Sequence, residues 1–272
     1  MPRILSYDEL PAWMKKDPRI RTGYREELRN VWKCVLSLFY VHNEFVNIWS
    51  HLLPALAYLA MLAKDARSAL VEADNDTGPE KKMIRFYVVT SFALMSLSSI
   101  FHIFGAHSER VARHILKLDY LGIIVNVSAT CITSSWFGFR HHAHVANIYM
   151  SLTLGLSIAI VFLLLKPSAD GPKAAKWRAF IIAGLMGTGY TPLIHAYLIG
   201  GIERLQHFPW QAAAKMLWAD LVGVLFYITR FPESRFPETF DVWGASHQIF
   251  HITVVVGRVV YLRGLKELVD LA

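Results

Sequence analysis

Val145-Ala-Asn-Ile-Tyr-Met-Ser-Leu-Thr-Leu-Gly-Leu-Ser-Ile-Ala-Ile-Val-Phe-Leu-Leu-Leu165 is a run of 21 residues without a charged side chain. A transmembrane helix needs about 20 consecutive apolar residues to cross the hydrocarbon core of a bilayer. The run is too long and too uniformly apolar to form only one face of a helix on a soluble domain. Its length and composition therefore predict a helix that spans a membrane.

The same pattern recurs along the rest of the chain. Only 18% of the 272 residues are charged, whereas soluble domains carry about 25% charged residues. The apolar blocks lie near residues 46–64, 84–105, 118–138, 145–165, 178–200, 213–231 and 242–263. Because their connections are short, we predict an all-α fold, a single bundle of seven transmembrane helices. Residues 1–45 then form an N-terminal segment, 46–264 the transmembrane domain and 265–272 a short outer tail.

The N-terminal segment is polar and charged, so it does not have the pattern of a signal peptide. Near its end, six apolar residues recur at helical spacing, namely Leu28, Val31, Trp32, Val35, Leu38 and Phe39. Basic residues fall on the other faces, which is typical of an amphipathic helix. Such a helix either lies on the membrane surface or packs against the end of the bundle, and these two interpretations do not exclude each other.

The distribution of Lys and Arg predicts the orientation of the bundle, because basic residues concentrate in cytoplasmic segments. With the N-terminus in the cytoplasm, 17 of the 28 Lys and Arg residues fall in inner segments. The C-terminus then lies outside, and the glycosylation sequon Asn75-Asp-Thr77 falls in an outer loop, where glycosylation is permitted. The net charge of +7 follows from these basic edges and gives no reason to expect a nucleic-acid partner.

His247 and His251 form a His-x-x-x-His pair inside the last apolar block. Residues four positions apart lie on one face of a helix, so the two imidazoles can share one metal ion. Histidines at membrane depth are unfavourable without such a partner or a polar cavity.

The predicted orientation brings further polar residues to the same inner depth, since His102 and Ser98 lie at the end of one block and Asp119 lies at the start of the next. Three histidines with an open fourth position are a known catalytic zinc arrangement. In that arrangement Asp119 could accept a proton from a bound water molecule, and Ser98 could hold a second water or donate to an oxyanion. The alternative is that the histidines only make hydrogen bonds between helices.

Eight ordered motifs run through the chain. They are Gly23-Tyr-Arg25, His42-Asn-Glu-Phe-Val-Asn-Ile-Trp-Ser-His51, Ser98-Ser-Ile-Phe-His102, His107-Ser-Glu109, Lys117-Leu-Asp-Tyr-Leu-Gly-Ile123, Tyr227-Ile-Thr-Arg-Phe-Pro-Glu233, Phe240-Asp-Val-Trp243 and Ser246-His-Gln-Ile-Phe-His251. With these motifs the sequence resembles the progestin and adipoQ receptor family, which is related to haemolysin III and includes the adiponectin receptors and the Izh-type zinc-homeostasis proteins. The resemblance covers nearly the whole chain from Thr22.

The resemblance implies a seven-helix fold with a cytoplasmic N-terminus, opposite in sense to G-protein-coupled receptors. It implies zinc held by His102, His247 and His251, with Asp119 next to the zinc-bound water. Adiponectin receptors are linked to ceramide hydrolysis, and related membrane hydrolases share the pattern of Ser, Asp and three His. The segment before Gly23 is shorter than the long leader of the adiponectin receptors, which favours an Izh-type member.

We therefore expect a zinc-dependent intramembrane hydrolase or receptor that acts on a membrane lipid, a ceramide-like amide, in lipid and zinc homeostasis. Its expected location is the plasma membrane or the endoplasmic reticulum, and an extracellular protein ligand is a further expectation. The first alternative is a receptor or sensor in which zinc is structural. The second is a zinc transporter, although one tight site near one face offers no path of weak sites across the bilayer.

Other polar residues have more than one interpretation. Asp220 and Arg258 lie inside apolar blocks, where they could pair with each other, although nothing in the sequence shows this pairing. His51 either supports the metal site or makes an ordinary helix contact. Two residues near the first block, Glu44 and Asn47, are typical of a helix cap. Glu233 is expected to shape the turn that positions the histidines of the last block.

Overall fold

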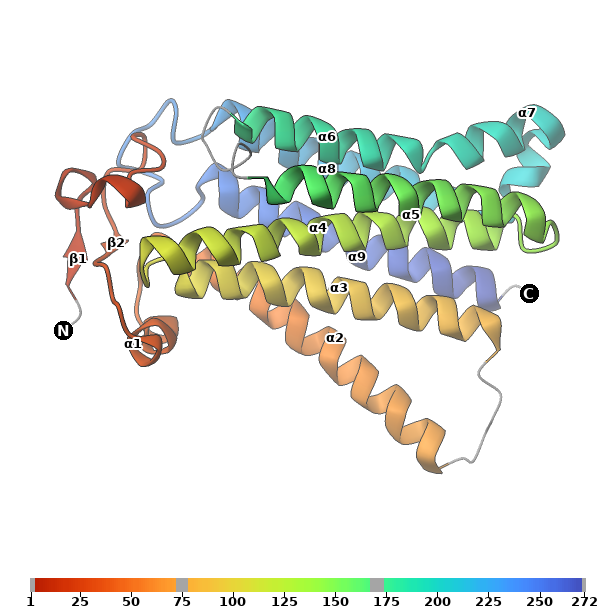
Figure 1. Ribbon diagram of the computed structural model, residues 1–272, viewed down its shortest axis with the longest axis horizontal. Helices are drawn as coiled ribbons and strands as arrows, with labels where there is room; N and C mark the ends of the chain where they lie inside the picture. The colour runs from red at the N-terminus through yellow and green to blue at the C-terminus, as the bar shows by residue number, and fades with distance from the viewer. Residues whose placement is uncertain (1–2, 72–77, 167–173, 271–272) are drawn as a thin grey trace. The chain divides into compact units, whose positions relative to one another are not determined.

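The computed structural model describes residues 3–71, 78–166 and 174–270, and its regular secondary structure is almost entirely helical (Figure 1). The elements are β1 (Ile4–Leu5), β2 (Tyr24–Arg25), α1 (Val31–Leu36), α2 (Phe45–Val71), α3 (Pro79–Phe104), α4 (Glu109–Gly138), α5 (Ala143–Leu165), α6 (Ala174–Thr188), α7 (Thr191–Leu205), α8 (Trp210–Thr229) and α9 (Ser246–Asp270). The helical fold is confirmed, and β1 and β2 form only a two-residue antiparallel pair. The sequon Asn75–Thr77 lies outside the described residues.

Five of the described helices, α2 over Phe45–Ser68, α3, α4, α5 and α8, are long and apolar enough to cross a membrane. The helix that contains the opening stretch, α5, has the highest mean hydropathy of these, at 2.4. The last helix, α9, has 25 residues but carries several charged side chains, so its composition alone does not mark it as a span. It also continues to Asp270, so residues 265–270 of the predicted tail are helical.

The fifth predicted block, 178–200, is divided between two helices, α6 and α7, of 15 residues each. The break falls at Gly189 and Tyr190, and Pro192 stands in the first turn of α7, where its missing N–H is harmless. Gly189 lies so close to α4 that a Cβ atom there would be 2.5 Å from Sγ of Cys131. Packing against α4 and the proline thus replace one continuous helix by two.

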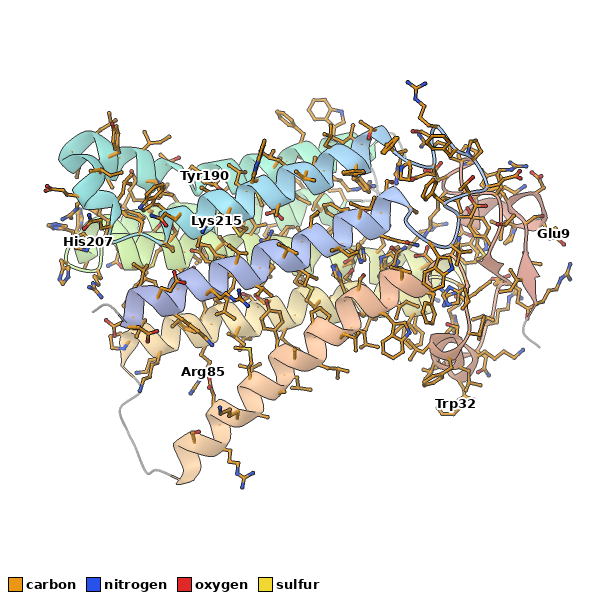
Figure 2. The ribbon with its side chains drawn as sticks, turned by 180° about the vertical axis from the view of Figure 1, so that it is seen from behind. Glu9, Trp32, Arg85, Tyr190, His207 and Lys215 are labelled. Carbon is orange, nitrogen blue, oxygen red and sulfur yellow. The ribbon has the colours of Figure 1, made fainter. Side chains whose placement is uncertain are left out.

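The predicted amphipathic helix is shorter than expected. Its α-helical part, α1, has six residues and is capped by Asn30, whose Oδ1 accepts from the N–H of Lys33 at 3.0 Å. The six apolar residues of the segment differ in burial. Leu28 is buried, whereas Trp32 is 66% exposed and its side chain projects away from the ribbon (Figure 2). Phe39, in the following 3-10 turn, is 74% exposed. One part of the segment packs on the helices, while the rest offers an apolar surface.

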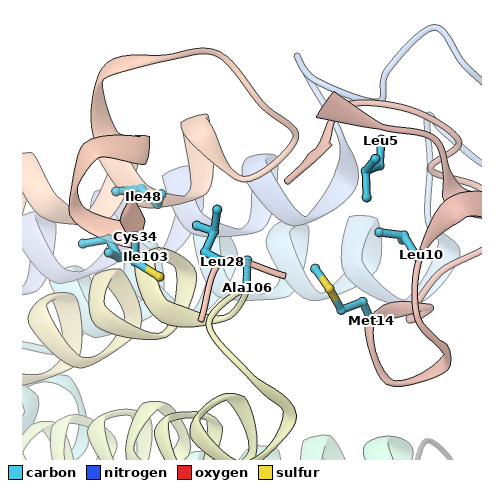
Figure 3. Packing of buried hydrophobic residues seen from close by; sticks show 8 residues of the cluster. All are labelled: Leu5, Leu10, Met14, Leu28, Cys34, Ile48, Ile103 and Ala106. Carbon is cyan, nitrogen blue, oxygen red and sulfur yellow. The ribbon is translucent and has the colours of Figure 1, made fainter. Parts of the chain in front are cut away.

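The described chain forms two compact units. Unit 1 comprises Met1–Leu56, Met95–Asp119 and Met216–Arg258, and unit 2 comprises Ala57–Leu94, Tyr120–Lys215 and Val259–Ala272. In unit 1, buried apolar side chains of the N-terminal segment meet those of α1, α2 and the end of α3 (Figure 3); they are Leu5, Leu10, Met14, Leu28, Cys34, Ile48, Ile103 and Ala106. The backbone N–H of Leu28 donates to the carbonyl of Ala106 at 2.9 Å. The N-terminal segment is therefore a folded part of unit 1.

Unit 2 contains hydroxyl and amide side chains that satisfy one another inside the helices. Asn126 of α4 donates to Ser91 of α3 at 3.0 Å, and Ser128 of α4 is hydrogen-bonded to Ser157 of α5 at 2.6 Å. The Tyr261 hydroxyl donates to the carbonyl of Thr130 at 2.9 Å. Such hydrogen bonds between helices are the usual partners of polar groups that have no access to water.

Asp220 of α8 and Arg258 of α9 form a buried ion pair within unit 1, as the sequence suggested they could. The Nη2 of Arg258 donates to Oδ2 of Asp220. A buried carboxylate and guanidinium are each strongly unfavourable without the other, so the pair links α8 to the helix that carries His247 and His251.

We expect Arg258→Ala to lower the free energy of unfolding by about 3–5 kcal/mol, because it leaves the Asp220 carboxylate buried and unpaired. Thermal unfolding of the purified protein in detergent measures the change. The double variant Arg258→Ala/Asp220→Ala should recover part of the loss, and the exposed Arg263→Ala is the matched control. A single-variant effect no larger than that of the control would show that the pair does not stabilise the fold.

Candidate metal site

The three predicted histidine ligands lie together in unit 1. His102 is in the last turn of α3, and His247 and His251 are in the first two turns of α9. One nitrogen atom from each ring lies within 4.8 Å of the other two. The ring centroids are 5.3 Å apart for His102 and His247, and 4.6 Å apart for His247 and His251. Side chains from two helices thus converge on one point.

The hydrogen-bonding state of these rings fits a metal ion. Nε2 of His102 and Nδ1 of His247 are buried and have no hydrogen-bond partner. A buried polar atom without a partner is unfavourable, so the interpretation that hydrogen bonds between helices satisfy all three rings does not account for these two atoms. Three neutral imidazole nitrogens suit Zn²⁺ among the common biological metal ions.

Ser98 and Asp119 also lie together beside this cluster. Ser98 is buried one turn before His102 in α3, and its hydroxyl donates to the half-buried carboxylate of Asp119 in α4. Asp119 interacts electrostatically with His102 and with Lys16 of the N-terminal segment. The structure therefore brings all five predicted site residues into one region of unit 1. Lys16 was not predicted from the sequence.

Arg25 holds the end of α3 at the histidine ligand. Its buried guanidinium donates to the carbonyl oxygens of His102 at 2.6 Å and Ile103 at 2.9 Å. The last carbonyls of a helix have no partners within the helix, so this side chain satisfies them. Two residues earlier, Gly23 has φ of +83°, and a Cβ there would lie 2.9 Å from Cγ2 of Val242. This geometry explains the glycine and the arginine of the motif Gly23-Tyr-Arg25.

Two carboxylates position the start of α9. Glu233 accepts hydrogen bonds from the backbone N–H of Ser246 at 2.8 Å and from its hydroxyl, as expected for a residue that shapes this turn. Asp241 accepts from the backbone N–H groups of Arg21 at 3.0 Å and Thr22 at 2.7 Å. The first contact caps the helix that carries His247, and the second ties the N-terminal segment to the loop before it.

Glu44 and Asn47, expected to cap α2, stand at its start and also reach the metal-ligand cluster. Oε2 of Glu44 lies 2.7 Å from Nδ1 of His102 and accepts from Nδ2 of Asn47 at 2.6 Å. The backbone N–H of Glu44 donates to Nδ1 of His42 at 3.1 Å. Burial and the nearby Arg25 lower the pKa of His42 to about 3, so this ring is neutral and can accept that bond.

His51 lies against the metal-ligand cluster. Its ring is stacked on His251, with centroids 3.9 Å apart and an interplanar angle of 13°. Both ring nitrogens of His51 are buried, and the ring also interacts with the backbone of His251. His51 of α2 therefore contacts one of the three predicted ligands directly.

Comparison with known proteins identifies the family. Residues 39–262 match the model of the haemolysin-III-related family. The chain is 33% identical to ADIPOR-like receptor IZH1 of Eremothecium gossypii over 97% of this chain and 84% of the relative. It is 32% identical to ADIPOR-like receptor IZH2 of Saccharomyces cerevisiae over 99% of this chain and 85% of the relative. It is 29% identical to the adiponectin receptor protein of Drosophila melanogaster over 98% of this chain and 60% of the relative. The chain therefore belongs to the haemolysin-III-related family of multi-pass membrane proteins, together with the adiponectin receptors and the progestin and adipoQ receptors.

Proposed function

We propose that this protein is a zinc-dependent intramembrane hydrolase of the adiponectin-receptor type, which cleaves the amide bond of a ceramide-like lipid. The observation that carries the proposal is the convergence of His102, His247 and His251, two of which have buried nitrogens without partners, beside the hydrogen-bonded pair of Ser98 and Asp119. The family supports a membrane location, and the receptor names of the relatives support a receptor role.

We further propose a seven-span topology in which α6 and α7 together make one crossing and α9 makes the last. The N-terminus is cytoplasmic and the C-terminus lies outside, in the plasma membrane or the endoplasmic reticulum. Five apolar helices and the excess of Lys and Arg in the predicted inner segments support this topology. With a rise of about 1.5 Å per residue, the site then lies roughly 5–10 Å below the cytoplasmic interface. The amide bond of a membrane lipid reaches that depth.

His102, His247 and His251 would hold the zinc ion, and three protein ligands leave a position open for water or substrate. A zinc ion held there supplies Lewis acidity and makes a water molecule a stronger nucleophile near neutral pH.

Asp119 would move the protons of the reaction. Its carboxylate accepts a proton from the attacking water and returns it to the nitrogen of the leaving amine, so that the amide and water become a fatty acid and an amine. The hydroxyl of Ser98 donates to this carboxylate and fixes its orientation. The burial of Ser98 keeps this hydrogen bond away from competing water.

The test of this proposal is to mix the purified protein with ceramides labelled in the acyl chain, over a range of chain lengths, at neutral pH. Mass spectrometry should detect fatty acid and sphingoid base in equal amounts, since one amide bond yields one of each. A zinc-replete preparation that releases neither product at any chain length would contradict the proposal.

A non-enzymatic receptor or sensor with structural zinc is the second candidate, and the receptor names of the relatives favour it. It predicts that His247→Ala lowers thermal stability and signalling together, with no turnover in the wild type. An extracellular protein ligand belongs to this interpretation.

Zinc transport is a weaker candidate. Within the described residues, the three histidines are the one cluster found with the spacing of metal ligands, whereas transport needs several weak sites along a path. Robust zinc flux into liposomes that contain the protein would reverse this ranking.

A further inference from the structure

We propose that the entry to α2 and its first two turns, which supply no metal ligand, orient two of the three ligands: Glu44 fixes His102, and Ser50 fixes His251. This inference rests on the proposed metal site. It assigns a role to a part of the structure that otherwise takes no part in the chemistry, and it concerns the affinity for zinc rather than the reaction itself.

The contact between Glu44 and His102 determines which nitrogen of the ring is available. Nδ1 of His102 lies 2.7 Å from Oε2 of Glu44. A carboxylate can only accept, so Nδ1 carries the proton and Nε2 keeps its lone pair. Nε2 is the atom that is buried without a partner. A carboxylate behind a histidine ligand fixes the tautomer and the ring plane and makes the nitrogen a better donor to a metal ion.

Glu44 is itself held in place. Its Oε2 accepts from Nδ2 of Asn47 at 2.6 Å, and its backbone N–H is bonded to His42. His42 is in turn bonded through Nε2 to the carbonyl of Ser37 at 3.1 Å. The carboxylate is therefore a fixed acceptor, which is what the positioning of a ligand requires.

Ser50 has the corresponding role for His251. Its Oγ lies 3.2 Å from Nδ1 of His251 and 3.1 Å from the carbonyl oxygen of Asn47. The hydroxyl of Ser50 donates to the carbonyl of Asn47, and His251 is also hydrogen-bonded to the backbone of Asn47. With its proton used in this way, Oγ of Ser50 is an acceptor for Nδ1–H of His251, and Nε2 of that ring is left for a metal ion. The stacking of His51 on His251 further restricts rotation of the ring.

The two contacts differ in charge, which predicts different magnitudes. The carboxylate of Glu44 partly neutralises a divalent ion bound by three neutral rings, whereas the hydroxyl of Ser50 is neutral and its contact is longer. We expect Glu44→Gln to weaken zinc binding by about 10–100-fold, the usual effect of removing such a partner. Ser50→Ala should weaken it by a smaller factor. Glu44→Asp keeps the charge but shortens the side chain, so its affinity should fall between those of wild type and Glu44→Gln.

The experiment measures the zinc dissociation constant of the purified protein by competition with a chromophoric chelator. The exposed Glu203 of α7 provides the matched control, Glu203→Gln, which should bind zinc as the wild type does. Cobalt substitution provides a second readout, since the visible absorption of Co²⁺ should change in Glu44→Gln if the ring of His102 changes its orientation. Thermal unfolding of the metal-free variants separates a loss of stability from a loss of affinity.

The outcomes distinguish a failure of the inference from a failure of the proposed function. Equal zinc affinity in Glu44→Gln and wild type would overturn the inference and leave the metal site standing. Wild-type protein that binds no zinc would overturn the proposed metal site and the inference with it. If Glu44→Gln does not fold, Glu44→Asp and Ser50→Ala decide the question, and unchanged affinity in both would contradict the proposed role of α2.

Discussion

His247→Ala will remove the zinc ion and reduce amide hydrolysis to the level of the buffer control. In this variant only two of the three ligands, His102 and His251, remain, and two neutral nitrogens bind the ion much more weakly than three. Metal analysis after gel filtration should show about one zinc per wild-type chain and almost none in the variant. The variant should also lose the stabilisation that bound metal gives the folded state, about 2.7 kcal/mol when the free ion is at 100 times its dissociation constant.

His144→Ala is the matched control for this prediction, because His144 is exposed in the first turn of α5 and belongs to unit 2. Its zinc content and hydrolysis should equal those of the wild type. Full zinc occupancy in His247→Ala would contradict the assignment of this histidine as a ligand. Hydrolysis that survives after the zinc has been lost would show that the reaction takes place at another site.

Asp119→Asn should lower the rate of hydrolysis by about 10²–10⁴-fold and leave zinc content unchanged. Asparagine has nearly the same shape as aspartate, but its amide cannot accept a proton from the attacking water, and general acid–base catalysis typically contributes a factor of this size. The carboxylate is not among the clustered ligand atoms, so the metal should remain bound. Initial rates with labelled ceramide, measured beside metal analysis of the same sample, check both parts of the prediction.

The exposed Asp65 of α2 offers the control substitution Asp65→Asn, which should leave the rate and the zinc content unchanged. Loss of zinc in Asp119→Asn would indicate that this carboxylate helps to hold the ion rather than to move protons. A rate that stays near that of the wild type would refute the proton-transfer role directly.

The helices were predictable from the sequence because their signal is local. A run such as Val145–Leu165 specifies a helix by its own length and composition, and it is observed as α5. The division of the fifth block was harder to predict. A proline inside an apolar block is a local signal of a break, but the need for glycine at Gly189 depends on Cys131, which is far away in the sequence.

In the candidate site, too, local patterns were predictable from the sequence, whereas contacts between distant residues were not. The spacing of His247 and His251 places them on one face of a helix, so the pair could be read from the sequence, and the orientation of the helices added His102. The role of Glu44 depends on a contact with a residue 58 positions away, which no local pattern contains. Arg25 likewise acts on the carbonyl of His102. Both residues stand inside the motifs that carry the family resemblance, and this was the available signal of their importance.

Fatty-acid release by a single preparation, measured before the metal is removed, after its removal and after its return, decides whether the zinc ion is catalytic. We expect release from labelled ceramide by the zinc-replete protein, loss of release after chelation and gel filtration, and recovery on addition of about one equivalent of Zn²⁺ per chain. Release that is unchanged after the zinc has been removed, or no release from the zinc-replete protein, would contradict this expectation.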